Sequence, residues 1–296
     1  MASTVAATSR KTSIFDAENP GFRESFDEKP FELKHCFTAD HPLFQLSRLR
    51  KLIEAPITRA GAYFDAGDIR VEQRWDSITP PKQTIEEVFE RIDNAGAWIL
   101  LKRVQNDPDY NELLEQCLNE VKLLSGRRID EDKKSQEAII FITSPRRVTT
   151  YHMDRECNFL LQVRGEKAIS IFDRNDRDVL PEQEIETFWS KDNNAAVYKP
   201  QYEDHAYAFT MKPGTGVHIP VNSPHWLKNG DNVSISFSIS YQYKDWHRKY
   251  VYQANYHLRK LGLNPTPPGR STLLDNTKRL IIQTGLKGKK LLRPAK

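Results

Sequence analysis

Cysteine and long apolar runs are what this chain has least of. Only three cysteines occur in 296 residues, Cys36, Cys117 and Cys157. They are too few and too widely spaced for a disulfide framework or a cysteine-based zinc site. No apolar run approaches the length of a membrane-spanning helix, and residues 1–13 lack the apolar core of a secretory signal. We therefore expect a cytoplasmic protein that does not enter the membrane.

An excess of charge of one sign is also missing. The chain has 44 Lys and Arg against 40 Asp and Glu, a formal net charge of +4. A balance this even gives no reason to predict nucleic-acid binding. The exception is the basic end, residues 285–296, which we interpret as a frayed, solvated tail. A contact with nucleic acid or an acidic partner is the alternative for this tail. No internal repeat or low-complexity block is present.

The length allows one elaborated domain or two. We divide the chain into a flexible segment 1–29, a domain 30–243 and a helical segment 244–296 with the basic tail. Patterning in the first half of the domain predicts a strand over 31–37, a helix over 42–54 capped by Asp40, paired strands over 57–64 and 69–75, a helix over 84–94, a strand over 96–104 and a helix over 108–124. A β-barrel starts at residue 138, and helices over 245–261 and 273–283 end the chain.

A His-x-Asp pair is the first sign of chemistry. His152 and Asp154 lie in a stretch rich in β-branched and aromatic residues, which predicts a strand over 147–154. Residues two apart on a strand point to the same face, so this imidazole and carboxylate can bind one metal ion from one direction. On a helix the same spacing would turn them apart.

The next two strands place a lysine near that pair. Segments 159–163 and 167–172 are joined by Arg164-Gly165, which predicts a hairpin with Gln162 opposite Lys167. In strict alternation, Asn158 and Lys167 share the inward face with the His-x-Asp pair. A bulge between residues 154 and 158 would break this alternation.

An inward-facing lysine among Ile and Leu needs an anionic partner, because an unpaired buried charge is costly. No acid on the face of Lys167 is an evident partner. A bound dicarboxylate would fit, with one end on the metal and the far carboxylate at Lys167. The hydroxyl of Thr149 could be a further donor at that far end.

A second histidine can complete the metal site. His225 follows a short strand over 216–220 and a turn over 222–224. Two imidazoles and one carboxylate that leave positions open are the ligand set of non-haem Fe(II) oxygenases. His218 on that strand is a weaker competitor, and His205 reads as a rim or surface residue. Residues 232–240 alternate apolar residues with serines, so Ser238 is expected to face a polar pocket.

Segment 138–243, about a third of the chain, resembles the JmjC/cupin-like Fe(II)- and 2-oxoglutarate-dependent oxygenases. It is closest in motif to the asparaginyl hydroxylase of the hypoxia pathway. The matching residues are Thr149, His152, Asp154, Asn158, Lys167, Pro213, Gly214, Ile219, Pro220 and His225. The resemblance implies a mainly β fold: a double-stranded β-helix (jelly-roll) core with N-terminal α/β elements and C-terminal helices.

The resemblance also implies roles for single residues. His152, Asp154 and His225 would hold Fe(II). Lys167 and Thr149 would bind the distal carboxylate of 2-oxoglutarate, with Asn158 and Ser238 near the metal or cosubstrate. The implied reaction is hydroxylation of a protein side chain or a small molecule, with succinate and CO2 as co-products.

The chain departs from the family pattern at Thr215, at Ser223-Pro224 and at Ser238, where the relatives carry an acid, an aromatic pair and an asparagine. These departures weaken any transfer of substrate identity. Demethylation of N-methyl lysine is less favoured, because no chromatin-reading module or zinc cluster accompanies the barrel.

Two other functions and two forms of assembly stay open. A non-redox cupin, such as an isomerase or a metal-binding sensor, would bind metal without turning over 2-oxoglutarate. A degenerate regulatory protein would keep only the fold, although the intact ligand set argues against it. The tyrosine-rich stretch 241–256 predicts either a homodimer interface or helix packing against the barrel.

Overall fold

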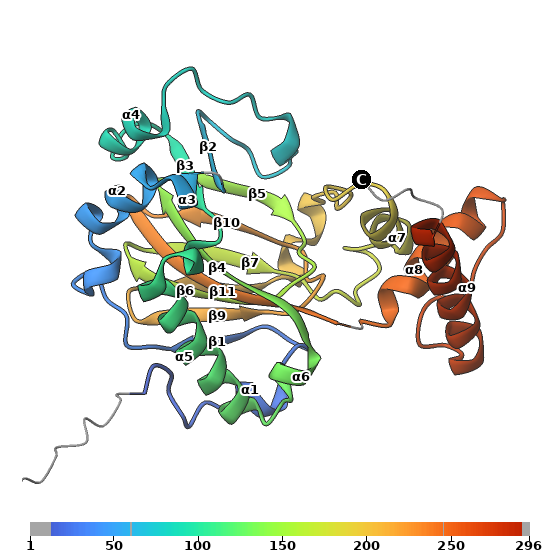
Figure 1. Cartoon of the computed structure of the whole chain (residues 1–296). Coiled ribbons are helices and arrows are strands. Elements are labelled where there is room, and N and C mark those ends of the chain that lie inside the picture. Colours follow the sequence, from blue (N-terminus) through green and yellow to red (C-terminus); the bar gives the residue numbers. More distant parts are fainter. Residues whose placement is uncertain (1–12, 60, 245, 292–296) are drawn as a thin grey trace, which may run out of the picture.

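Two antiparallel sheets form the centre of the molecule (Figure 1). The computed structural model describes residues 13–59, 61–244 and 246–291. The larger sheet has the strand order β1 (Phe31–Lys34), β9 (Thr215–Ile219), β6 (Cys157–Arg164), β11 (Ser234–Tyr243), β4 (Lys133–Thr143), β3 (Ala97–Leu101) and β2 (Ala62–Ala66). The smaller has the order β5 (Val148–His152), β10 (His225–Asn229), β7 (Lys167–Ile171) and β8 (Tyr207–Met211).

Helices cover the outside of this core. Their bounds are α1 (Gly21–Glu24), α2 (Leu46–Glu54), α3 (Pro56–Arg59), α4 (Ile85–Glu90), α5 (Pro108–Ser125), α6 (Ile129–Asp132), α7 (Glu182–Ser190), α8 (Arg248–Lys260) and α9 (Thr272–Leu291), with 3-10 turns η1 (Pro42–Phe44), η2 (Trp75–Ser77), η3 (Val104–Asn106) and η4 (Pro200–His205). Apolar residues of α2, α4 and α5 pack on the outer face of the seven-stranded sheet. α7, α8 and α9 gather at the other side of the molecule (Figure 1).

The alternation of β11 decides how the two layers meet. Its apolar residues Ile235, Phe237 and Ile239 belong to the outer core beneath the helices. Its serines are buried on the opposite face, toward the four-stranded sheet. That inner layer also contains Leu160 of β6 and Ile169 of β7. The apolar and polar faces predicted for this strand are therefore confirmed, and the polar inner face prepares the site described below.

Two predicted helices of the N-terminal half are present as α4 and α5, and both begin at a side-chain cap. Thr84 and Glu87 form a capping box at the start of α4. Asp107 accepts from Asp109 N at the start of α5, and Gly126 ends that helix with a left-handed φ of 68°. At the first predicted helix the cap was wrong: His41, not Asp40, accepts from Leu43 N, and the chain forms η1 and then α2.

Two predicted strand pairings were also wrong. The segment over 57–64 contains α3 and the start of β2, and residues 69–75 are turn and η2 rather than a strand. β2 pairs with β3 instead, at the edge of the large sheet. The predicted hairpin of β6 and β7 does not form, because these strands belong to different sheets. Their inner faces still meet, since the two sheets lie face to face.

The N-terminal segment is more ordered than predicted. Residues 1–12 lie outside the described part of the chain. Over 13–29 the chain is packed rather than loose, because Ile14, Phe15, Phe22 and Phe26 are buried in the outer core. The C-terminal helices are present as expected, as α8 and α9. Within residues 13–59, 61–244 and 246–291, none of the helices has the length and apolar character needed to cross a membrane.

Candidate metal centre and its cavity

Three predicted ligands come together between β5 and β10. His152 ends β5, His225 starts β10, and the two are register partners in the β5–β10 ladder. Asp154 lies just beyond β5, with its Oδ2 3.9 Å from His152 Nε2 and 3.7 Å from His225 Nε2. All three ligand atoms lie within 4.8 Å of one another, and no other such cluster occurs in the described residues. The arrangement can hold a divalent metal ion from one side.

Both imidazoles are oriented for metal binding by backbone carbonyls. His152 Nδ1 lies 2.7 Å from the carbonyl oxygen of Thr150, and His225 Nδ1 lies 3.0 Å from that of Ser223. A carbonyl oxygen only accepts, so each ring in its neutral form carries the proton on Nδ1 and presents the Nε2 lone pair to the cluster. Burial, helped by the neighbouring His152, lowers the pKa of His225 to about 4, so this ring is neutral at physiological pH.

Lys167 is the second unusual group. Its side chain is 3% exposed, and burial lowers its pKa to about 7. Its ammonium donates to Ser236 Oγ at 3.0 Å and lies 6.0 Å from the centre of the Phe141 ring. No carboxylate in the described part of the chain lies within ion-pair distance of it. The Ser236 hydroxyl donates in turn to Gln162 Oε1. Ser236 of β11 therefore links Lys167 of β7 to Gln162 of β6 by two hydrogen bonds.

The remaining predicted residues lie nearby but play different structural parts. Thr149 and Asn158 line the same cavity as the ligand trio and Lys167. Ser238 is not among the lining residues; its buried hydroxyl donates to Asn158 Oδ1 at 2.8 Å. Ser238 therefore orients the Asn158 amide.

The competing histidines are occupied elsewhere. His218 is fully buried, accepts from Asp27 N through Nε2 at 2.9 Å, and has its Nδ1 3.0 Å from the Asn158 carbonyl oxygen. With both ring nitrogens used, it has no lone pair for a metal. His205 is at the surface, where it pairs with Asp176.

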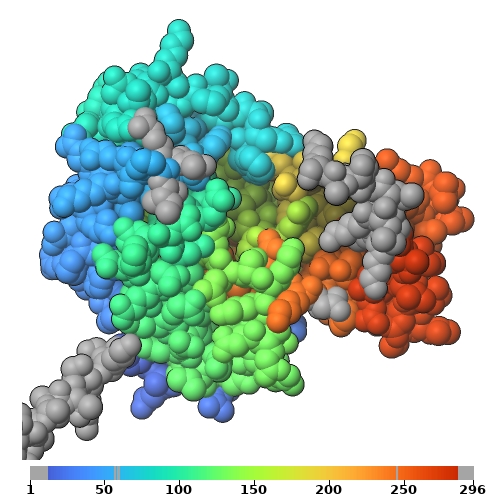
Figure 2. Space-filling model, viewed as in Figure 1, coloured from blue at the N-terminus to red at the C-terminus, as the bar shows by residue number. Residues whose placement is uncertain are grey.

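One cavity of about 590 Å³ contains the ligand trio and Lys167 in its walls. Its size is within the range of small-molecule sites, about 300–1,000 Å³. Near the centre of the view in Figure 2 the surface is hollowed, between the cyan segment above and the orange end of β11. Apolar walls come from both sheets: Leu100, Phe141, Leu160, Ile219 and Leu227.

Several cavity residues were not found from the sequence. Arg147 and Asp65 form a buried ion pair in the wall, 82 residues apart in the chain. Glu156 accepts from Gln242 Nε2 at 2.5 Å, and burial with the nearby Asp154 carboxylate raises the Glu156 pKa. Trp75 comes from the segment that was predicted to be a strand. None of these residues belongs to a motif, and only the tertiary structure brings them to the cavity.

Comparisons with known proteins support the fold. No family model and no curated protein matches this sequence. Among solved structures, YcfD of Escherichia coli is similar over 93% of this chain and 67% of its own, with 12% identity and a TM-score of 0.51. A structure of Escherichia coli YcfD described as a ribosomal oxygenase in complex with cobalt and 2-oxoglutarate has a TM-score of 0.45 at 12% identity, over 91% of this chain and 65% of that one.

A cupin superfamily protein of Desulfitobacterium hafniense is similar over 37% of this chain and 69% of its own, with 10% identity and a TM-score of 0.24. This chain spans about two-thirds of the length of YcfD. At such identities the likeness concerns the fold alone. The predicted fold class, a mainly β jelly-roll core with flanking helices, is confirmed.

Proposed function

We propose that this protein is an Fe(II)- and 2-oxoglutarate-dependent oxygenase that hydroxylates a protein side chain or a small molecule. One observation carries the proposal: two imidazoles and a carboxylate converge in the same cavity as a buried lysine that has no acidic partner in the described residues. The trio matches the ligand set of non-haem iron, and the lysine calls for an anion.

Each side chain has a part that its position supports. His152, Asp154 and His225 would hold the metal from one side and leave the cavity side open. Lys167 would bind the distal carboxylate of 2-oxoglutarate, with the Thr149 hydroxyl as a further donor. Asn158, oriented by Ser238, would lie beside the metal or the cosubstrate.

The bound pair would supply the oxidising power: O2-dependent decarboxylation of 2-oxoglutarate to succinate and CO2, coupled to insertion of oxygen into a substrate C–H bond. The protein's contribution is to orient the metal, the cosubstrate and the substrate, and to exclude water. Leu160, Ile219 and Leu227 line the cavity with apolar side chains and would keep water away from the metal. The part of the wall that contains Trp75, which is 41% exposed, is left for the substrate.

The test is spectroscopic and needs no substrate. Anaerobic protein is mixed with Fe(II) and then with 2-oxoglutarate, and the visible metal-to-ligand charge-transfer band is recorded. The band should form in the wild type and be lost in His152→Ala and Asp154→Ala. In Lys167→Met, iron affinity should stay within about twofold, while 2-oxoglutarate affinity falls by about 100-fold, as expected for removing the ammonium partner of a buried carboxylate.

Matched controls separate binding from folding. His205→Ala removes a surface histidine, and Lys102→Met removes an exposed lysine that lines the same cavity; both should keep the band. Metal bound without any band in the wild type would favour a non-redox cupin and end the oxygenase proposal. An equal loss of iron and 2-oxoglutarate in Lys167→Met would make that lysine purely structural.

We propose that the enzyme is cytoplasmic and that it forms a homodimer through its C-terminal helices. The tyrosine-rich stretch does not support the dimer by itself, because Tyr252 is buried within the chain and Trp246 stacks on Trp189 of α7. What supports it is the outer face of α9, where Leu273, Leu280 and Ile281 are 76%, 65% and 64% exposed.

A further inference from the structure

A short segment closes one side of the cavity without belonging to either sheet. Residues 69–78, here called the strap, follow β2 and contain η2. The strap contributes Trp75 and Ile78 to the cavity wall. Its first half meets the barrel at Val71, which accepts from Tyr151 N at 2.9 Å and packs on the apolar cluster around Tyr151. Beyond that point something else must hold Trp75 against the cavity.

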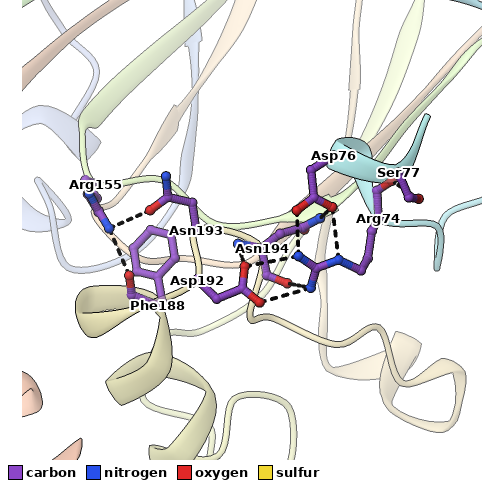
Figure 3. Close-up of polar contacts among 8 residues, drawn as sticks. All are labelled: Arg74, Asp76, Ser77, Arg155, Phe188, Asp192, Asn193 and Asn194. Atoms are coloured by element: carbon purple, nitrogen blue, oxygen red, sulfur yellow. Dashed lines mark hydrogen bonds and ion pairs between the residues drawn. The ribbon is translucent and has the colours of Figure 1, made fainter. Parts of the chain in front are cut away.

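Arg74 provides that hold (Figure 3). Its guanidinium donates to Asp76 at 3.0 and 2.6 Å within the strap. It also donates to both carboxylate oxygens of Asp192, at 3.1 Å each, and to the carbonyl oxygen of Asn194 at 2.9 Å. Asn194 returns a bond to Asp76 Oδ1 at 3.0 Å. These four residues, here called the clasp, join the strap to a loop 118 residues away in the chain, just after α7.

The same loop is held from the metal side. Arg155, the residue after the proposed ligand Asp154, donates to Asn193 Oδ1 at 2.6 Å and to the Phe188 carbonyl oxygen at 2.9 Å. Arg155, Phe188 and Asn193 all line the cavity. Figure 3 shows the two arginines reaching this loop from opposite ends, Arg155 through Asn193 and Arg74 through Asp192 and Asn194. The position of the strap is thus tied to the wall beside the metal centre.

The clasp is electrostatically one-sided. Asp76 and Asp192 share the Arg74 guanidinium, which lowers the pKa of both carboxyl groups. Within the described residues, no other basic side chain forms an ion pair with either of them. Without Arg74 the two carboxylates would repel each other across the junction of strap and loop. Its removal should therefore open the strap and not merely loosen it.

We infer that Arg74 is a positioning residue for substrate recognition: it closes the strap over the cavity and fixes Trp75 as the wall against which the substrate lies. The role of Trp75 toward a substrate rests on the proposed function. The closure itself does not, because it follows from the clasp contacts alone.

Hydrogen exchange measured by mass spectrometry on metal-free protein tests the closure. In Arg74→Ala, amides of residues 71–78 and 192–196 should exchange about tenfold faster, while β5 and β10 keep wild-type rates. Arg74→Ala/Asp192→Asn should recover much of the protection, because it also removes one of the repelling charges. Arg70→Ala is the matched control, since this exposed arginine of the strap pairs only with Glu72 among the described residues and should change nothing.

Unchanged exchange in Arg74→Ala would overturn the inference, and so would an equal rise throughout both sheets, because Arg74 would then only stabilise the fold.

A second readout concerns function. With iron, 2-oxoglutarate, O2 and ascorbate as the two-electron reductant, Arg74→Ala should keep the charge-transfer band but turn over 2-oxoglutarate without substrate about threefold faster, because the opened cavity no longer shields the centre from the reductant. Absence of the band in the wild type would remove the oxygenase proposal, while the exchange result on the clasp would stand.

Discussion

At the scale of single residues, Lys167 carries a charge that the described protein groups do not balance. Its ammonium has one hydroxyl partner and an aromatic face, and burial lowers its pKa from 10.5 to about 7. Folding therefore favours the neutral amine, whereas a bound carboxylate would favour the ammonium. Burial of this lysine therefore lowers the free energy of unfolding when no anion is bound, and the same effect favours the binding of an anion.

The pH dependence of stability follows from this shift. Between pH of about 7 and 10.5 the unfolded chain holds the Lys167 proton and the folded chain does not, so stability rises with pH across this window. The penalty is full below pH 7 and disappears above pH 10.5. We expect the free energy of unfolding of Lys167→Met to exceed that of the wild type at pH 7 by on the order of 4 kcal/mol at most. The difference should decrease toward pH 10.

Chemical unfolding of both proteins at pH 7 and pH 10, without metal, checks this expectation. Lys102→Met serves as the control, because Lys102 is exposed and its replacement should leave the pH dependence unchanged. A variant Lys167→Met that is less stable than the wild type at pH 7 would mean that the lysine is balanced inside the empty protein. The need for a bound anion would then lose its physical basis.

At the scale of elements, the sequence predicted what depends on neighbouring residues. β11 was found from its alternation, α4 from its apolar face and α5 from Asp107-Pro108 at its start, because these signals lie within a few residues of the element. Strand pairing was predicted poorly. Gln162 and Lys167 were expected opposite each other in a hairpin, but a jelly-roll sends consecutive strands to different sheets. No local pattern distinguishes a crossing between sheets from a tight turn.

The candidate site divides in the same way. His152 and Asp154 could be paired from their spacing, and His225 from its place after a turn. The walls could not be predicted, because Trp75, Glu156 and Gln242 meet only through tertiary packing. The bond from Ser238 to Asn158 likewise depends on the register between β11 and β6.

Gly165 allows the chain to pass from β6 in the larger sheet to β7 in the smaller sheet, a connection here called the crossing. Gly165 has a φ of +72°, and a Cβ there would lie 2.5 Å from the Val233 carbonyl oxygen. Gln162 Nε2 secures the crossing by donating to the carbonyl oxygens of Arg164 and Gly165. We expect Gly165→Ala to destabilise the fold by about 2–4 kcal/mol, from the left-handed conformation and the clash together. It should also lower the affinity for 2-oxoglutarate, because Lys167 follows two residues later and would be displaced.

Gly262 offers a matched control for this prediction. Its φ is +79°, but a Cβ there would meet nothing within 4 Å. Gly262→Ala should therefore cost only about 1 kcal/mol in the free energy of unfolding and leave cosubstrate affinity unchanged. Equal losses in the two variants, measured by urea unfolding, would show that conformation alone matters at Gly165 and that the crossing tolerates a side chain.

At the scale of the whole molecule, the C-terminal helices raise the question of what covers α9. α8 uses its apolar side within the chain: Val251, Tyr252 and Ala254 are buried, and α8 packs on α7. One side of α9 packs on α8, and Lys278 of α9 donates to the carbonyl oxygen of Thr266 in the connection between the two helices at 2.7 Å. The other side has leucines and an isoleucine spaced seven residues apart, which places Leu273 with Leu280 and Leu274 with Ile281.

A second copy of α9 would cover this side by symmetry, because a twofold axis brings the same apolar residues face to face. We expect the wild type to be a dimer by light scattering coupled to size-exclusion chromatography, and Leu280→Asp/Ile281→Asp to be a monomer with unchanged thermal unfolding of the barrel. Leu123→Asp is the control, since that leucine of α5 is 71% exposed but stands apart from the α9 face. A wild type that stays monomeric at tens of micromolar would contradict the dimer, and the exposed face of α9 would then have to bind another partner.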